Sequence, residues 1–356
     1  MQSRIADGRR AAPPRPTLLV GDILQCHAAF DRLQQRVLEL SLERQACIDE
    51  TAGSSVDAWR DLVPRCRALR ETLTSLRQLS HFTREVYECA ADVCARAQDW
   101  PEALKALQQL VHLIYPALAV QQLQQQQQQR CSPVPAGPPG LTSSAPSLPA
   151  AAAEQGSGCA AVARWADEGC DEDGDAGLLG GLGAALVDGA TVAAALRQPE
   201  FRRWPEAAAA LSLYFACVQQ QAGDRLDTLT TLRRFPRRIL ETPEVQLALR
   251  LHSALGGPGG NFVSLFRLRS SAPQLVQLVT VAAAQRGREQ ALVVMAAAYR
   301  SIAVPAVCRM LQLASNTRQL LACLKLLADR GHLGAQRALG GLQQEEQVWA
   351  ATVVFK

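Results

Sequence analysis

The segment from residue 81 to residue 115 limits most strongly what this chain can fold into, because it reads as two short amphipathic helices separated by "DWP". Its first half carries apolar residues at spacings of three and four, the pattern of a helix with one buried face: Phe82, Val86, Ala90, Val93 and Ala97. Pro101 ends the first helix and suits the first turn of the next, where Asp99 is placed to cap a free amide and Glu102 follows three residues later. The second half carries a matching stripe: Leu104, Leu107, Leu110, Val111 and Ile114. We therefore predict an antiparallel helix pair, a unit that buries its faces only by stacking on neighbours.

Helical patterns of this kind cover most of the remaining chain. Residues 1–20, which include "RRAAPPRP", predict a disordered basic tail, and residues 21–118 predict a series of N-terminal helical repeats. Short apolar-periodic segments separated by Gly, Pro or Asp resume near Trp204, so residues 200–300 predict further helical repeats. The expected fold class is all-α, a TPR-like helical-repeat solenoid.

Residues 119–199 differ in composition from both flanking regions. They contain "QQLQQQQQQR", a stretch rich in Pro, Gly, Ser and Ala, and the acidic run "DEGCDEDGD". A segment with so few large apolar side chains cannot bury a core, so we predict a disordered low-complexity insertion. The spacing of the acidic run does not fit a calcium loop. Counted from Asp171, the twelfth position, which needs a bidentate Glu, is Leu182.

The last segment, residues 301–356, predicts a winged helix. Two helices, "VPAVCRMLQL" and "NTRQLLACLKLLADRG", are joined by a tight turn, with Asn316 placed to cap the second helix and Gly331 to end it. The following "QVWAATVVF" is rich in β-branched and aromatic residues and predicts a strand. Two helices followed by a small hairpin are the element order of a winged helix.

The charge of the chain is distributed unevenly. The net charge is +4, but the residues from Thr231 to the end hold 16 Lys plus Arg and 6 Asp plus Glu, a balance of +10, against −6 for residues 1–230. A basic C-terminal half is typical of a protein that binds a polyanion, and nucleic acid is the obvious one inside a cell. The alternative is a solvated basic surface without a ligand.

Sequence motifs for catalysis, metal binding or phosphate loops are absent. The glycines of "GLLGGLG" and "GGPGGN" lack the Lys-Ser/Thr of a phosphate loop, there is no G-x-S-x-G turn, and no C-x-x-C pair or histidine cluster provides metal ligands. The 11 cysteines are scattered and no secretory signal precedes them, so we expect a reduced intracellular protein. No run of about 18 apolar residues predicts a membrane span. We expect a non-enzyme without cofactor, metal or membrane contact.

Three segments resemble one group of proteins. "FTREVYECAADVCARAQDWPEALKALQQLVHLIY" is similar to a pattern of the Sac/GANP/Thp group of PCI-domain proteins at Phe82, Val86, Tyr87, Glu88, Ala90, Asp99, Gln109, Leu110 and Tyr115. "NFVSLFRLRSSAP" and "MAAAYRSIAVPAVCRML" resemble two further segments of that group. The alanines of residues 207–210 stand where the group has Glu-Phe, and the insertion is foreign to its pattern. The resemblance covers about residues 60–118 and 207–335.

The resemblance implies a non-catalytic nuclear scaffold in messenger-RNA export or transcription-coupled RNA processing. In that group the winged helix of the PCI module packs on a second PCI-domain protein, a small acidic protein of the DSS type braces the pair, and the joint basic surface holds RNA or DNA. Two other classes stay open: a proteasome-lid or signalosome subunit with a purely structural role in protein degradation, and a hydrolase whose site has no recognisable motif.

Two sets of residues are the expected binding sites. Arg318 and Lys325, seven residues apart, fall on one face of a helix whose buried stripe is Leu320, Leu324 and Leu327. Together with other cations of the segment they are candidate phosphate contacts: Arg300, Arg309, Arg318, Lys325, Arg330 and Arg337. The apolar C-terminal strand is the candidate edge for a protein partner, through Trp349, Val353, Val354 and Phe355.

Overall fold

The helix pair of residues 81–115 forms as predicted. In the computed structural model, helix α4 (His81–Arg96) and helix α5 (Trp100–Gln109) pack against each other, and the amide of Glu102 donates to Asp99 Oδ1 at 3.3 Å. The stripe of α4 is buried, with Val86, Ala90 and Val93 each 0% exposed. The structure describes residues 22–46, 52–131, 187–219, 224–255, 261–313, 317–344 and 352–354.

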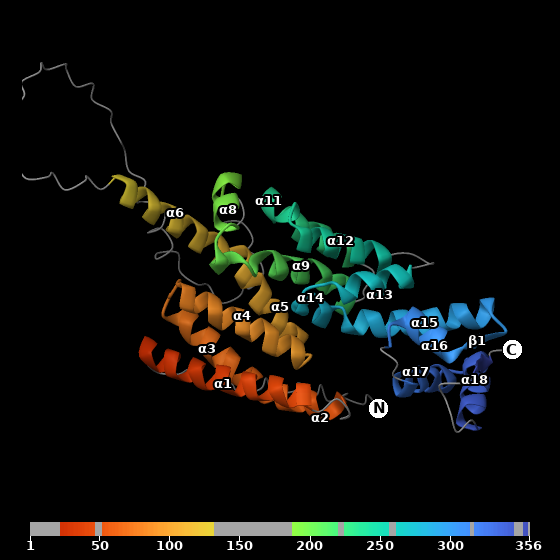
Figure 1. Cartoon of the computed structure of the whole chain (residues 1–356). Helices are drawn as coiled ribbons and strands as arrows, with labels where there is room; N and C mark the ends of the chain where they lie inside the picture. Colours follow the sequence, from red (N-terminus) through yellow and green to blue (C-terminus); the bar gives the residue numbers. More distant parts are fainter. Residues whose placement is uncertain are drawn as a thin grey trace, which may run out of the picture.

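The described chain is mostly helical, which confirms the all-α class. Before α4 come three helices: α1 (Ile23–Ala46), α2 (Ala52–Arg60) and α3 (Val63–Ser75). Figure 1 shows them in red and orange beside α4, and α1 and α3 are in contact. After α5, the π-helical turn η1 (Leu110–Ile114) leads directly into α6 (Tyr115–Cys131), so one unbroken helical stretch runs from Trp100 to Cys131.

The insertion is shorter than the 119–199 that the composition predicts. The glutamine tract continues α6 to Cys131, because Gln is a good helix former and extending an existing helix needs no new nucleus. At the other end, α8 (Gly189–Ala195) and the 3₁₀ turn η3 (Pro199–Phe201) pack back on the protein, where Phe201 is 0% exposed and Gln122 Nε2 donates to Gln198 Oε1. Residues 132–186 and the predicted tail 1–20 lie outside the described residues.

Helix α9 (Trp204–Tyr214) is the central element of the second half. It packs on α5, α12 (Pro243–Leu255) and α14 (Gln274–Val279). The alanines of residues 207–210 are at most 3% exposed and let these neighbours approach closely. The other elements of this part are η4 (Phe215–Gln219), α10 (Asp224–Arg233), α11 (Arg237–Leu240), α13 (Phe262–Ser270) and α15 (Val281–Ala298).

The C-terminal segment forms a helical unit with a two-stranded sheet. Strand β1 (Ser301–Ala303) precedes α16 (Val304–Leu311), α17 (Thr317–Asp329) and α18 (Leu333–Gln344), and it pairs antiparallel with β2 (Thr352–Val354), Ile302 opposite Val353. The predicted strand is therefore confirmed over Thr352–Val354, and the rest of "QVWAATVVF" lies outside the described residues. Its partner is β1, which lies before the helices, and the intervening "AQRALG" belongs to a third helix, α18. Figure 1 shows this unit, in blue, at the opposite end of the molecule from α6 and α8.

The turn between α17 and α18 forms as predicted. Gly331 has φ +84°, a left-handed conformation that glycine adopts without steric cost, and its amide donates to Ala328 O at 2.9 Å. The amide of His332 donates to Leu327 O at 3.0 Å, which closes the end of α17. Leu320, Leu324 and Leu327 are buried, as their spacing predicts. Asn316, the predicted cap, lies outside the described residues.

One stretch of the described chain could cross a membrane by length and composition alone. It is Trp100–Gln129, and 56% of its most apolar window is buried inside the protein. Such burial is what a core helix shows, because its apolar face is covered by neighbouring helices rather than by lipid.

Candidate nucleic-acid interface

Five of the six candidate phosphate-binding residues are exposed on the C-terminal unit, and one of these five, Arg330, is held in an ion pair. Arg300 follows α15, Arg309 lies on α16, Lys325 on α17 and Arg337 on α18, and all four are exposed to solvent. They lie at four separate places in the sequence, so each is held by a different part of the unit. The backbone of Arg318 belongs to α17, two turns before Lys325, whereas its side chain is outside the described part.

Arg330 is not a free cation. Its guanidinium donates to Glu289 Oε2, and the Glu289 side chain is only 10% exposed. The pair links the end of α17 to α15, so Arg330 serves first to neutralise a buried carboxylate. The sequence pattern predicted Arg330 as a phosphate contact and did not predict its ion pair with Glu289.

Three further arginines of the basic half are used inside the protein. Arg269 donates to Thr280 Oγ1 and Gln277 O, Arg286 donates to Cys217 O, and Arg288 donates to Leu311 O. Burial lowers the pKa of each guanidinium, and the neighbouring charge of Arg288 lowers that of Arg269 further. The +10 balance of the C-terminal half therefore overstates the charge that a ligand meets.

Of the residues predicted to contact a protein partner, the structure describes the side chains of Val353 and Val354, and only Val354 is exposed. Val353 is 0% exposed and belongs to the hydrophobic core, so the prediction that it contacts a partner is wrong. Its side chain is buried because strand residues alternate between faces and α18 packs on β2. Val354, the next residue, is 46% exposed, while Trp349 and the side chain of Phe355 lie outside the described residues.

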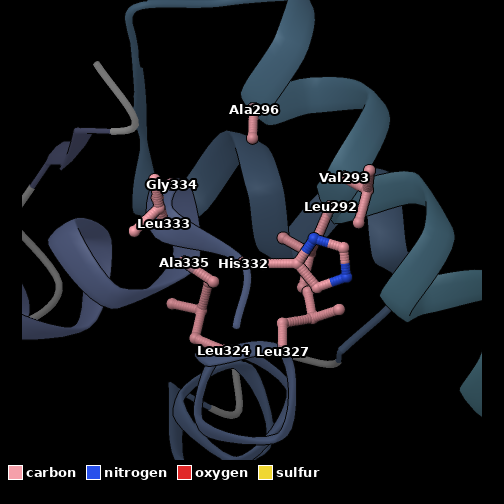
Figure 2. Close-up of a pocket in the computed structure, with 9 residues that line it drawn as sticks. All are labelled: Leu292, Val293, Ala296, Leu324, Leu327, His332, Leu333, Gly334 and Ala335. Atoms are coloured by element: carbon pink, nitrogen blue, oxygen red, sulfur yellow. The ribbon is translucent and has the colours of Figure 1, made fainter. Parts of the chain in front are cut away.

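A small apolar pocket lies between α15, α17 and α18. Figure 2 shows the ring of His332 among the apolar lining residues, beside Leu292 and Leu327. Its volume is about 80 Å³, well below the several hundred Å³ of pockets that hold cofactors or drug-sized ligands. The pocket fits a single apolar side chain or a few water molecules.

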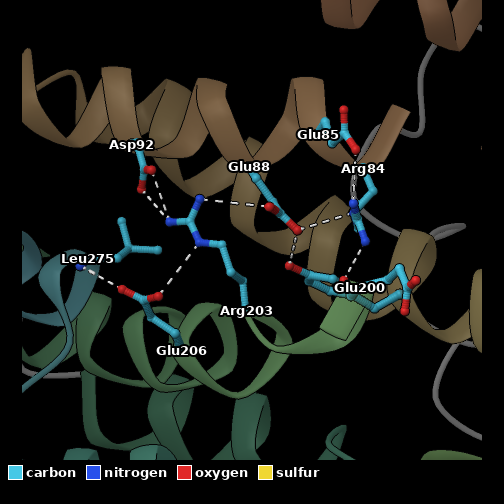
Figure 3. Close-up of polar contacts among 9 residues, drawn as sticks. Arg84, Glu85, Glu88, Asp92, Glu200, Arg203, Glu206 and Leu275 are labelled. Carbon is cyan, nitrogen blue, oxygen red and sulfur yellow. Dashed lines mark hydrogen bonds and ion pairs between the residues drawn. The ribbon is translucent and has the colours of Figure 1, made fainter. Parts of the chain in front are cut away.

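A group of charged side chains joins the two halves of the chain across the insertion. Arg203 Nη2 donates to both oxygens of Asp92, at 2.8 and 2.9 Å, and Arg203 lies 3.8 Å from Glu88 and 3.6 Å from Glu206 (Figure 3). Glu206 in turn accepts from the amide of Leu275 at 2.9 Å. Sequence reasoning missed this group, although Glu88 and Tyr115 belong to the resembling pattern and Tyr115 donates to Glu88 at 2.7 Å.

The pKa values of Glu88 and Arg203 are both raised in this group. Burial raises the pKa of the Glu88 carboxyl, against the bond from Tyr115 and the charges of Arg203 and Arg84. Burial also opposes the charge of Arg203, but Asp92, Glu206 and Glu88 outweigh it and raise the pKa of that guanidinium. Paired carboxylates with a raised pKa can serve catalysis. Here the space among Glu88, Arg203 and Leu275 does not admit a water-sized molecule, so that space cannot hold a substrate.

The described cysteines are poor nucleophiles. Cys66, Cys94 and Cys217 carry free thiols inside the core, and Cys89 is half-buried beside it. Burial raises the pKa of Cys89 and Cys94 to about 12. A thiol with so high a pKa is protonated at neutral pH and does not attack or ligate. Within the described residues, no three His, Cys, Asp or Glu side chains gather as metal ligands.

Comparison of the chain with protein-family models, with curated proteins and with solved structures finds no match.

We expect His112 to make the stability of the fold depend on pH. It lies on η1 with its ring 5.7 Å from that of Phe235, and burial together with the charge of Arg234 lowers its pKa to about 4. The unfolded chain takes up this proton first, near an ordinary pKa of about 6.5, so protonation favours unfolding. We expect acidification from about pH 7 to about pH 4.5 to remove roughly 2 kcal/mol of stability through this residue.

The variant His112→Phe tests this expectation in urea unfolding series at several pH values. It should lose that part of the pH dependence, whereas His332→Gln, a change at an exposed histidine, should keep it. Equal pH dependence in wild type and His112→Phe would show that His112 is protonated in the folded protein.

Proposed function

We propose that this chain is a non-catalytic scaffold of the Sac/GANP/Thp group of PCI-domain proteins. It pairs with a second PCI-domain protein and a small acidic DSS-type protein, and it holds RNA or DNA by the phosphates in nuclear messenger-RNA export or transcription-coupled processing. The C-terminal unit is the winged helix of this proposal, and the preceding helices are its repeat solenoid.

The main support is the solvent-exposed charge of the C-terminal unit. Arg300, Arg309, Lys325 and Arg337 point to no carboxylate among the described side chains, so their charge is available to a polyanion. Contacts from separate elements to phosphate oxygens position a nucleic acid without reading its sequence. A scaffold role is further supported by the packing at Arg203, where the carboxylates join helices through ion pairs.

The charge-reversal variant Arg309→Glu/Lys325→Glu tests the nucleic-acid part of the proposal. If each side chain neutralises one phosphate, the slope of log affinity against log salt should fall by about 1.4 for single-stranded RNA. The loss should be similar for RNAs of unrelated sequence, because phosphates carry no sequence information. Fluorescence anisotropy with the full chain measures both quantities.

The matched control is Arg60→Glu on α2, an exposed arginine of the N-terminal half. It should leave RNA affinity nearly unchanged. The native mass of the complex isolated from cells, with the identity of its subunits, tests the partners. A complex of protease-lid or signalosome subunits, together with no RNA binding by the wild type, would instead favour the structural role in protein degradation.

A further inference from the structure

Four exposed arginines lie within six residues of one turn, more than 60 positions before the C-terminal unit begins at Ser301. The sequence "RRFPRR" of residues 233–238, here called the arginine turn, connects α10 to α11. All four arginines are exposed, and the side chain of Arg237 is 91% accessible. No other six residues of the described chain hold as many exposed arginines.

The backbone of the arginine turn is anchored in the core. Phe235, between the two arginine pairs, is 5% exposed, and Ile239 just after them is 0% exposed. The amide of Phe235 donates to Leu232 O at 3.1 Å, that of Ile239 donates to Pro236 O at 2.9 Å, and α11 packs on α8. Pro236 fixes its own φ near −55°. The arginines therefore project from a backbone that is already ordered, which lowers the entropic cost of binding a ligand.

Little of this charge is neutralised by the protein. Glu241 accepts from Arg237 and from Arg238, each at 3.1 Å, in pairs that are exposed to solvent and therefore weak. The nearby carboxylate of Asp188 instead caps α8 by accepting from the amide of Thr191 at 2.6 Å. Arg233 and Arg234 have no carboxylate partner among the described side chains.

We propose that the arginine turn is a phosphate-binding surface for single-stranded nucleic acid, additional to the cations of the C-terminal unit. Several guanidinium groups on one ordered turn suit a ligand with repeated phosphates better than one with a single anion. Arginine rather than lysine throughout also favours phosphate, because the planar fork donates two parallel hydrogen bonds to its oxygens. The inference rests on the proposed function, since it assigns a second contact area to the same ligand.

The test compares two variants of the full chain with the wild type. The probe is a fluorescein-labelled single-stranded RNA of mixed sequence, measured by anisotropy across a salt series. Arg233→Gln/Arg234→Gln/Arg237→Gln/Arg238→Gln should lower the salt slope by about 2.8 and the affinity on the order of a hundredfold at about 0.1 M salt. Glu241→Gln should do the reverse, tightening binding, because it removes the carboxylate that competes for Arg237 and Arg238.

The outcomes separate this inference from the proposed function. Suppose that the fourfold variant keeps its circular dichroism and binds RNA as tightly as the wild type does. That result would overturn the role of the arginine turn and leave the proposed function standing. A wild type that does not bind RNA would overturn both. If polyaspartate of matched charge binds the wild type as tightly as RNA and loses affinity in the same variant, the surface serves an acidic protein segment and the inference is wrong. Glu241→Gln is expected to raise RNA affinity, which a misfolded protein would not do. If the fourfold variant does not fold, the affinity of Glu241→Gln therefore decides the matter, and an unchanged affinity would overturn the inference.

Discussion

Replacing Glu102 by alanine is expected to lower the free energy of unfolding by about 4 kcal/mol. Glu102 accepts from Arg70, and the two side chains are only 12% and 7% exposed. Without the carboxylate, the Arg70 guanidinium stays buried between α3 and α5 with no opposite charge to offset its lost hydration. Urea unfolding followed by far-UV circular dichroism at neutral pH measures the loss.

Two further variants separate charge from packing at this pair. The half-exposed pair of Arg67 and Glu71 is the control, and Glu71→Ala should cost less than about 1 kcal/mol because water screens that pair more than it screens Arg70 and Glu102. The double variant Arg70→Met/Glu102→Leu should recover most of the loss, since two apolar side chains leave no buried charge. Equal stability of Glu102→Ala and Glu71→Ala would mean that water reaches Arg70 in the folded protein.

Glu102 also predicts a direction for acid sensitivity. Burial opposes its charge, but the bond from Lys105 and the charge of Arg70 outweigh burial and lower the pKa of Glu102. A carboxyl with a lowered folded-state pKa stabilises the fold above its ordinary pKa, and that stability is lost as the pH falls through the lowered value. The wild type should lose this contribution below about pH 4, and Glu102→Gln should lack it at every pH.

Replacing Arg203 by methionine is expected to lower the free energy of unfolding by about 3 kcal/mol. This is less than the loss expected for Glu102→Ala, because the Arg203 side chain is 34% exposed and water screens its charge. The variant leaves Glu88, Asp92 and Glu206 close together without their shared cation. These carboxylates then repel one another in a partly buried site. Arg60→Met, at an exposed pair on α2, should change stability by less than about 1 kcal/mol.

The sign of the pH dependence distinguishes the Arg203 variant from a simple loss of packing. The pKa of Glu88 is already raised, and removing Arg203 raises it further. A carboxyl whose folded-state pKa lies above its unfolded value is protonated more readily in the folded state, so protonation stabilises the fold. Stability of Arg203→Met should therefore recover partly as the pH falls through the raised pKa of Glu88. A variant whose deficit is the same at every pH would have lost packing alone.

Local rules account for the parts of the fold that could be predicted from the sequence. Asp99 and Pro101 determine where α5 begins, the spacing of Val86, Ala90 and Val93 determines which face of α4 is buried, and Gly331 ends α17. Each depends on residues within a few positions, whose geometry the helix itself imposes. The all-α class follows from the same periodicity, repeated along the chain.

Tertiary structure alone decided which side chains are available for binding. Arg203 and Asp92 are 111 positions apart, and β1 pairs with a strand beyond three helices, so no local pattern connects them. Composition predicted an insertion from residue 119, yet α6 continues to Cys131 and α8 packs back on it. A count of charges likewise treats Arg330 and Lys325 alike, whereas Glu289 neutralises only Arg330. The physical reason is the same in each case. Burial and ion pairing depend on distances between residues far apart in the sequence, and helical periodicity does not determine those distances.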